Sequence, residues 1–240
     1  MNLKIEKLIK QYSGKPVLDG IDLNLEDVQV LALIGASGSG KSTLLRLLSG
    51  LESFDGGEIT VNGHLVDSGS DEAYRKKIGF VFQDHNLFPH LSLLENVLLV
   101  LEKVHNRKSP EVLADVNELF NQFGLSEHTD KKPHQISGGQ GQRASIVRAL
   151  AIKPDLILLD EPTSSLDPIL THEVLNAVKL LVDDRIDFVI VTHEIGFARE
   201  VADYIVFMDE GKIIEHGRPE ILENPSSEKL KRFLEKVLSF

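Results

Sequence analysis

Residues 30–43 read Val30-Leu31-Ala32-Leu33-Ile34-Gly35-Ala36-Ser37-Gly38-Ser39-Gly40-Lys41-Ser42-Thr43 and contain the clearest structural signal in the chain. An apolar run of strand length leads into a turn rich in glycine, and leucines follow at helical spacing from Leu44 to Leu48. The stretch therefore predicts a buried strand, a loop and the N-terminus of a helix. This is a setting in which proteins bind phosphate groups.

The loop supplies several groups that suit an anion. Its glycines permit backbone torsions that turn successive N–H groups toward one point, and the helix that begins near Lys41 adds unpaired N–H groups and its dipole. Lys41 contributes a positive charge for the outer phosphates, and the Ser42 hydroxyl is placed to ligate magnesium. A flexible Gly/Ser turn is the weaker alternative, because every position of the phosphate-loop pattern is filled. The nucleotide-binding residues predicted here are Gly35, Ser37, Gly38, Ser39, Gly40, Lys41, Ser42 and Thr43.

Length, charge and composition limit the classes of function. The 240 residues suffice for one large α/β domain or for a core with an inserted subdomain. A formal net charge of −11 argues against broad binding to nucleic acid or anionic lipid, which needs a basic face. The lack of cysteine excludes disulfides and thiol chemistry. Residues 1–10 show no signal-peptide core and no apolar run approaches a membrane span, so we expect membrane contact only through a partner.

Short strands on both sides of the phosphate loop predict a small antiparallel layer beside the main sheet. Residues 3–8 are apolar at positions 3, 5 and 8, and residues 21–25 alternate apolar and polar side chains. Residues 58–61 form another short strand, and Asn62-Gly63 marks a hairpin. Tyr12 is expected in the turn between the first two strands. Its ring can stack on a nucleobase or serve as a partly buried structural residue, and both roles fit the sequence.

Between residues 84 and 134 the pattern changes from strand to helix, which we interpret as a helical insertion between two core strands. Ser92-Leu93-Leu94-Glu95 is a capping box, Ser109-Pro110 predicts a capped helix start, and Gly124 can end that helix. A further helix begins at Ser137-Gly138-Gly139-Gln140. Its two glycines leave N–H groups available for a second anion site, although an ordinary capped helix fits the same residues.

An apolar strand at residues 156–159 is followed by two adjacent acids, Asp160 and Glu161. Paired acids at the end of a buried strand are costly unless a cation or a proton compensates their charge. Adjacent strand residues point to opposite faces, so the two acids should have different roles. Asp160 suits the magnesium shell, and Glu161 suits activation of the attacking water.

Two other predicted strands also end in polar side chains. The strand at residues 187–191 ends at Thr192-His193, and its position on the phosphate side of a parallel sheet favours a functional role for His193. The strand at residues 78–82 ends at Gln83. A lone glutamine at a strand end is more commonly solvated polar surface than a functional group.

The order of these motifs resembles that of the ATP-binding cassette ATPases over essentially the whole chain. Any one of the motifs could mislead, but six in this order are specific. They are the phosphate loop, Gln83, the helical insertion with Ser137-Gly138-Gly139-Gln140, Leu156 to Glu161, Ser164-Ser165-Leu166-Asp167, and His193.

The resemblance implies a P-loop NTPase (RecA-like) α/β core with a small antiparallel β layer and an inserted helical subdomain. We therefore expect residues 1–240 to form a single ATPase domain. Its core would comprise residues 1–83 and 153–225. Residues 84–152 would form the helical subdomain with the signature motif, Ser137-Gly138-Gly139-Gln140, and residues 226–240 a C-terminal helix.

The resemblance also implies ATP and Mg²⁺ as cofactors and a head-to-tail homodimer. Each ATP would lie between the phosphate loop of one chain and the signature motif of the other, which accounts for two anion sites. Tyr12 would stack on adenine, and Asp167 would carry signals across the dimer. Gln83 would contact magnesium and the attacking water, and Asp160 would hold magnesium through a water molecule. Glu161 would be the general base, His193 would contact the γ-phosphate, and Lys41 would supply catalytic charge.

Three positions depart from the family pattern, but none removes a group that touches phosphate. Val28 stands where many members have glycine, Ile136 replaces the usual leucine, and Gly141 replaces a frequent glutamine. Segments 86–90, 192–200 and 207–211 resemble the ATPase subunits of bacterial polar amino-acid importers.

That resemblance implies an ATPase bound peripherally to the cytoplasmic face of the bacterial inner membrane. Its partners would be integral-membrane permease subunits and, indirectly, a periplasmic or extracellular solute-binding protein, with no nucleic acid. The alternatives are a soluble ATP-gated clamp and a cassette ATPase for another solute or a lipoprotein. Lys41 and Asp160 are too close in sequence for the long coiled coil of a DNA-repair clamp, and the chain holds one cassette where ribosome-associated members hold two.

Overall fold

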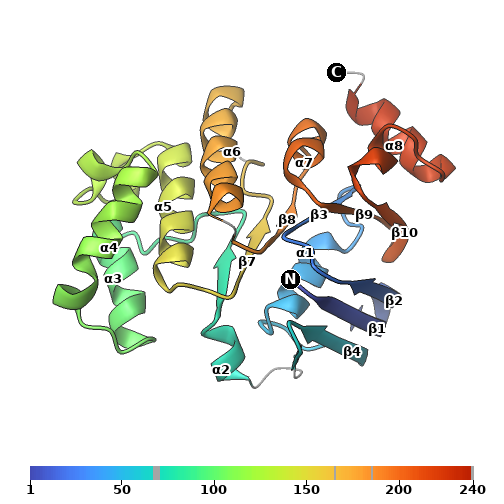
Figure 1. The fold of residues 1–240 in the computed structure, drawn as a ribbon, viewed down its shortest axis with the longest axis horizontal. Helices are drawn as coiled ribbons and strands as arrows, with labels where there is room; N and C mark the ends of the chain where they lie inside the picture. Colours follow the sequence, from blue (N-terminus) through green and yellow to red (C-terminus); the bar gives the residue numbers. More distant parts are fainter. Residues whose placement is uncertain (67–70, 165, 185, 239–240) are drawn as a thin grey trace. The chain divides into compact units, whose positions relative to one another are not determined.

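The structure is a computed structural model that describes residues 1–66, 71–164, 166–184 and 186–238 (Figure 1). The chain forms two compact units. The first unit comprises Met1–Arg75 and Arg185–Phe240, and the second unit comprises Lys76–Asp184.

The first unit contains a mixed sheet built around strand β3 (Val30–Gly35). Strand β3 pairs in parallel with β8 (Phe188–Val191) and β9 (Tyr204–Asp209), and β10 (Lys212–Gly217) runs antiparallel to β9. Every residue of β3 is buried, which explains its uninterrupted apolar sequence. Helix α1 (Lys41–Leu48) begins after the loop that follows β3. The predicted order of strand, loop and helix is confirmed.

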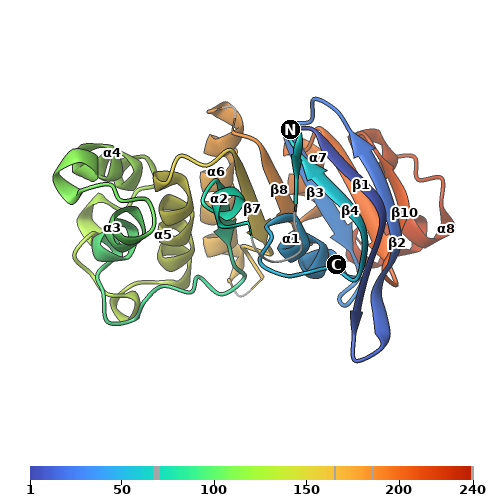
Figure 2. The ribbon, with the colours of Figure 1, turned by 90° about the horizontal axis from the view of Figure 1, so that it is seen from below.

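An antiparallel sheet forms a second layer of the first unit. Its strands are β1 (Leu3–Tyr12), β2 (Lys15–Leu25), β4 (Gly56–Val61) and β5 (His64–Leu65), in the order β2-β1-β4-β5. Figure 2 shows β1, β2 and β4 side by side. The predicted layer is confirmed, but Tyr12 is the last residue of β1 and precedes the turn, because the pairing of β1 with β2 extends to Tyr12 and Lys15.

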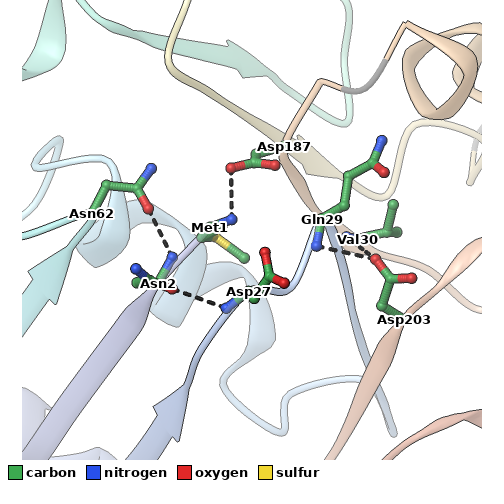
Figure 3. Close-up of polar contacts among 8 residues, drawn as sticks. All are labelled: Met1, Asn2, Asp27, Gln29, Val30, Asn62, Asp187 and Asp203. Atoms are coloured by element: carbon green, nitrogen blue, oxygen red, sulfur yellow. Dashed lines mark hydrogen bonds and ion pairs between the residues drawn. The ribbon is translucent and has the colours of Figure 1, made fainter.

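Two aspartates fix the amino ends of strands in the first unit (Figure 3). Asp203, just before β9, accepts hydrogen bonds from the backbone N–H groups of Gln29 and Val30 at 3.0 and 2.9 Å. Asp187, just before β8, forms an ion pair with the Met1 ammonium group at 2.7 Å. These contacts set where β3 begins, and with it the position of the loop at its other end.

The second unit pairs β6 (Ile78–Val81) in parallel with β7 (Leu156–Asp160). Figure 1 shows α3, α4 and α5 of this unit as neighbouring helices. Its helices are α3 (Leu93–Lys103), α4 (Ser109–Gln122), α5 (Gly138–Ala151) and α6 (Pro168–Asp183), with 3₁₀ turns η1 (Ser126–His128) and η2 (Pro133–Gln135).

Two of the predicted helix boundaries are confirmed and one is wrong. The capping box of Ser92 and Glu95 is present, and Gly124 follows α4 with a φ of 66°. The prediction of Ser109 as a cap is wrong. Lys108 is the N-cap of α4, and the Ser109 hydroxyl donates to the carboxylate of Glu102.

The remaining elements are short or lie near the end of the chain. They are α2 (Glu72–Arg75), α7 (Ile195–Val201), η3 (Pro219–Leu222) and α8 (Glu228–Leu238). None of the helices in the described ranges has both the length and the apolar character needed to cross a bilayer. The second unit includes β6, β7 and α6 as well as α3, α4 and α5, and the division into a core and a helical subdomain at residues 84–152 stays a prediction.

Candidate nucleotide-binding site

The phosphate loop adopts backbone conformations that glycine alone tolerates at two positions. Gly35 has a φ of 148°, and a β-carbon there would lie 2.1 Å from the carbonyl oxygen of Met208. Gly40 has a φ of 100°, and its β-carbon would lie 2.7 Å from Cδ2 of Leu18. Both glycines are therefore required by close packing as well as by torsion.

Polar groups of the loop are arranged to receive an anion. Lys41 is only 3% exposed, and its Nζ donates to the carbonyl oxygens of Gly35 and Ala36 at 3.0 and 2.9 Å. The Ser39 hydroxyl is buried and has no hydrogen-bond partner among the described residues. Helix α1 has no side-chain cap and no acid in its first turn. A phosphate group would satisfy the Ser39 hydroxyl and pair with the positive end of the helix, so the loop fits this ligand.

Tyr12 offers an exposed aromatic ring in the same unit. Its side chain is 41% exposed, and its hydroxyl donates to the Glu52 carboxylate. Partial burial, and then this hydrogen bond, raise the pKa of the Tyr12 phenol above its usual value, so the ring stays neutral near pH 7. The Nζ of Lys10 lies 5.0 Å from the ring centroid. The exposed part of the ring suits stacking on a base.

The pairing of β3 with β8 places His193 close to the phosphate loop. In the parallel pair of β3 and β8, Leu33 is opposite Val191, and the Thr192 N–H donates to the Leu33 carbonyl at 3.3 Å. The exposed His193 therefore follows β8 at the carboxyl edge of the sheet, where the loop leaves β3. Ligands of parallel sheets bind at this edge.

The second unit places Gln83 and the two acids at one edge of another parallel pair. Val81 of β6 is opposite Leu159 of β7, so the exposed Gln83 and the pair Asp160 and Glu161 follow neighbouring strand ends. The Phe82 carbonyl accepts from Nε2 of Gln142 at 3.0 Å, which ties the segment before Gln83 to α5.

The two acids occupy different environments, but strand alternation is not the cause, because β7 ends at Asp160 and Glu161 lies outside the strand. Asp160 is 2% exposed at the end of β7, whereas Glu161 is partly exposed. Glu161 has a φ of 45°, and its carbonyl accepts from the Ser164 N–H at 3.2 Å in a tight turn. A left-handed backbone costs a residue other than glycine about 1 kcal/mol or more, and such strain is concentrated at functional sites.

The predicted magnesium-binding residues have oxygen donors, which suit this metal. Within the described residues, no group of three or more His, Asp or Glu side chains is arranged to hold a metal ion. Magnesium commonly binds one or two protein groups and completes its shell with water and substrate phosphates. Ser42 of the first unit and Asp160 of the second unit each carry an oxygen donor of the kind that magnesium binds.

The signature motif begins α5 and is arranged as a complete capping box. The Ser137 hydroxyl accepts from the Gln140 N–H at 3.2 Å, and Oε1 of Gln140 accepts from the Ser137 N–H at 3.0 Å. Ser137 is exposed at the start of the helix. The side chains of Ser137 and Gln140 thus shape the helix start, and the N–H groups of Gly138 and Gly139 follow in its first turn.

Asp167 has a structural role that the sequence analysis missed. It is the N-cap of α6, and its carboxylate accepts from the N–H groups of Ile169 and Leu170 at 2.9 and 3.0 Å. Asp167-Pro168 is a recognisable helix start, since an aspartate cap commonly precedes proline. Ser165, in the predicted motif before it, lies outside the described residues.

A cavity of about 720 Å³ in the first unit is not a candidate for phosphate. It lies at the amino ends of β3, β8 and β9, the edge opposite to the phosphate loop. Carboxylates dominate its charged lining and would repel phosphate. The acidic residues are Glu26, Asp27, Asp187, Asp203 and Glu220, beside the single basic side chain of Arg218.

Comparisons with known proteins agree with this geometry. A family described as "ABC transporter" matches residues 18–164. The L-cystine transport system ATP-binding protein TcyN of Escherichia coli is 43% identical over 98% of both chains. The glutamine transport ATP-binding protein GlnQ of Escherichia coli is 44% identical, over 98% of this chain and 99% of that protein. The arginine transport ATP-binding protein ArgV of Corynebacterium glutamicum is 45% identical over 97% of both chains.

Solved structures show the same fold. The dimeric structure of MJ0796, described as a bacterial ABC transporter cassette, has a TM-score of 0.81 and 32% identity, over 90% of this chain and 98% of that one. A dimeric post-hydrolysis state of the same cassette, bound to ADP and Pi, has a TM-score of 0.80 at the same identity and coverage. The predicted P-loop ATPase core is confirmed by this likeness.

Proposed function

The chain belongs to the ABC transporter family, and we propose that it is the ATP-hydrolysing subunit of an importer for polar amino acids. The observation that carries the ATPase assignment is the phosphate loop, with its buried Lys41 and the buried Ser39 hydroxyl, which has no partner in the described part of the chain. Support for the transported solute comes from relatives of nearly equal length that are described as cystine, glutamine and arginine transport proteins.

Nucleotide binding uses residues of the first unit. N–H groups of the phosphate loop and of the first turn of α1 surround the β- and γ-phosphates. The Lys41 ammonium group, which donates to two carbonyl oxygens of the loop, binds the phosphates instead when ATP is present. Tyr12 stacks on adenine with its exposed ring. The remaining contacts come from the loop residues Gly35, Ser37, Gly38, Ser39, Gly40, Ser42 and Thr43.

Hydrolysis of ATP to ADP and phosphate needs a base, an orienting group and stabilisation of charge. Glu161 accepts the proton of the attacking water, Gln83 orients that water, and His193 donates to the γ-phosphate. Magnesium, when bound, neutralises the charge that develops on the phosphate oxygens. Ser42, Gln83 and Asp160 would hold it, Asp160 through a water molecule.

In the proposed homodimer two chains associate head to tail, and the start of α5 serves as a second anion site. The signature motif of one chain faces the nucleotide in the phosphate loop of its partner, and Asp167 transmits the state of one site to the other. Two observations support this arrangement: the exposed helix start at Ser137, and the dimeric form of the solved cassettes with the same fold. ATP thus holds the two chains together until it is hydrolysed.

A permease is the expected membrane partner. The expected contact is formed by residues 86–91, which we call the docking loop, together with the helix after Ser92. Phe88 is 41% exposed and Leu87 is partly exposed, in a loop that contains Pro89. Exposed apolar groups commonly mark an interface. The chain would lie at the cytoplasmic face of the bacterial inner membrane and cooperate indirectly with a periplasmic or extracellular solute-binding protein. Its net charge of −11 disfavours nucleic acid as a partner.

Purification from native membranes followed by reconstitution tests this function. The chain should co-purify with integral-membrane subunits, and proteoliposomes with these subunits and their binding protein should import cystine, glutamine or arginine only when ATP is supplied. A Lys41→Ala chain in the same proteoliposomes serves as the inactive control. ATP-driven import of a different solute would contradict the amino-acid assignment. Absence of any membrane partner would favour the alternative, a soluble ATP-gated clamp.

A further inference from the structure

His128 contacts the side chain of Gln140 in the signature motif. The Nε2 atom of His128 lies 2.9 Å from Nε2 of Gln140. His128 is the last residue of η1, twelve residues before Gln140, and both lie in the second unit. The function proposed above assigns no role to this histidine.

The capping box determines which atom of the Gln140 amide faces the imidazole. Oε1 of Gln140 accepts from the Ser137 N–H, so the amide NH₂ group points to His128 and must donate. The Nε2 atom of His128 is therefore the acceptor.

The backbone around His128 is held by the first turn of α3. The N–H groups of Leu94 and Leu93 donate to the carbonyls of Thr129 and Lys131, both at 2.9 Å, and the Lys131 N–H donates to the His128 carbonyl at 3.0 Å. The bonds from Leu93 and Leu94 use N–H groups that a helix leaves unpaired at its start. The imidazole therefore projects from a fixed segment and can define the position of Gln140.

The imidazole makes one hydrogen bond within the described part of the chain, and it makes that bond to Gln140. Its Nδ1 atom is buried and has no partner there. Among the described residues, the Nε2 contact to Gln140 is therefore the hydrogen bond that can orient the ring.

We infer that His128 is a positioning residue for the signature motif. By accepting a hydrogen bond from the Gln140 amide, it keeps Oε1 of Gln140 on the Ser137 N–H and so preserves the N-terminal turn of α5. Without this acceptor the amide can rotate, and the capping box weakens. The effect on ATP rests on the dimer proposed above, whereas the effect on Ser137 does not.

Substitutions at His128 distinguish the effect of losing the hydrogen-bond acceptor from the effect of changing the shape of the side chain. His128→Gln supplies an acceptor oxygen at the end of its side chain, whereas His128→Phe and His128→Leu supply none. His105→Leu is the matched control, because His105 is another partly buried histidine of the second unit. Circular dichroism of the four full-length variants checks that each one is folded. Two variants without an acceptor are used so that the test can still be made if one of them misfolds.

The first measurement is hydrogen exchange of the Ser137 amide by NMR, without nucleotide. Exchange should be about 3- to 10-fold faster in His128→Phe and His128→Leu, as expected for the loss of one hydrogen bond. His128→Gln and His105→Leu should exchange at the parent rate. Parent-like exchange in both non-accepting variants, or equally fast exchange in His128→Gln, would overturn the inference.

The second measurement is ATP-dependent dimerisation by light scattering, in chains that also carry Glu161→Gln to prevent hydrolysis. The protein concentration for half-maximal dimerisation should rise about 3- to 10-fold in His128→Phe and return to the parent value in His128→Gln. ATP affinity of the monomer should not change. If Ser137 exchange responds as expected but the parent does not dimerise with ATP, the positioning role holds and the proposed dimer is wrong.

Discussion

The imidazole ring of His85 occupies the space beside the α-carbon of Gly141. A β-carbon at Gly141 would lie 2.2 Å from Cδ2 and 2.7 Å from Nε2 of His85, closer than van der Waals contact permits. Gly141 is buried in α5, and Arg148 of the same helix donates to the carbonyls of His85 and Asn86 at 3.1 and 2.9 Å. The segment after Gln83 is thus packed against α5, which explains glycine at position 141 where the family often has glutamine.

Gly141→Ala should lower the free energy of unfolding by about 1 kcal/mol, because the new methyl group displaces the His85 ring. Alanine normally stabilises a helix relative to glycine by a similar amount, so in a His85→Ala background the same change should stabilise the protein. Urea unfolding of the two single variants and the double variant measures this reversal. The explanation fails if Gly141→Ala has the same effect in both backgrounds.

Local patterns predicted the phosphate loop and its flanking elements, whereas contacts between distant residues could not be predicted. The apolar run of β3 and the glycines after it specify their structure within a few residues, as does the capping box at Ser92. The sequence analysis missed helices α2, α6 and α7, although Asp167-Pro168 signals the start of α6. The roles of His85 and His128 depend on packing against α5, and no local spacing reveals such packing.

Asn96 fixes the shape of the docking loop. It is completely buried in α3; its Oδ1 accepts from the Phe88 N–H at 2.7 Å, and its Nδ2 donates to the carbonyls of Phe88 and Ser92 at 3.2 and 2.8 Å. One side chain thus binds both backbone polar groups of Phe88, the exposed aromatic residue of the loop.

Asn96→Ala should lower the free energy of unfolding by about 2 kcal/mol, because it leaves several loop groups without their partner. ATP hydrolysis by the isolated chain should remain, since the phosphate loop does not involve Asn96. Affinity for the permease should fall by about tenfold or more as the loop loses its shape. Binding to detergent-solubilised permease, compared between parent and variant, measures this. Unchanged binding would place the interface elsewhere.

The capping box of α3 predicts a dependence of stability on pH. The hydrogen bond from the Ser92 N–H, 2.7 Å from the Glu95 carboxylate, holds the pKa of Glu95 below its usual value. A carboxyl whose pKa is lower in the folded state contributes stability above its unfolded pKa of about 4.5, and that contribution is lost as the pH falls through the folded value.

Glu95→Gln retains an acceptor at Ser92 but cannot titrate. The difference in melting temperature between the parent and Glu95→Gln should therefore be largest at pH 7 and should shrink on acidification below about pH 4.5. Glu6→Gln is the control, because Glu6 is an exposed acid outside any helix cap. A difference that stays constant from pH 7 to pH 3 would show that the charge of Glu95 does not act through the cap.

The strained backbone of Glu161 allows its chemical role to be separated from its structural one. Glu161→Gln keeps the size of the side chain but cannot accept the proton of the attacking water. We expect turnover to fall roughly 100-fold or more, and ATP to stabilise the dimer, because one negative charge beside the γ-phosphate is removed. Light scattering with and without ATP, paired with phosphate release, measures both effects. A variant that stays monomeric with ATP and hydrolyses at the parent rate would refute the assignment.

Glu161→Gly removes the same base and also relieves the left-handed strain at a φ of 45°. Glycine adopts this conformation without steric cost, so the free energy of unfolding should rise by up to about 1 kcal/mol while hydrolysis is lost. Asn62→Gly is the matched control, since Asn62 has a φ of 49° in the turn before β5, away from the proposed chemistry. It should leave turnover unchanged. If Glu161→Gly is more stable than the parent but inactive, glutamate at this position is required for catalysis and not for stability. Parent-like turnover in Glu161→Gly would show that Glu161 serves only the turn.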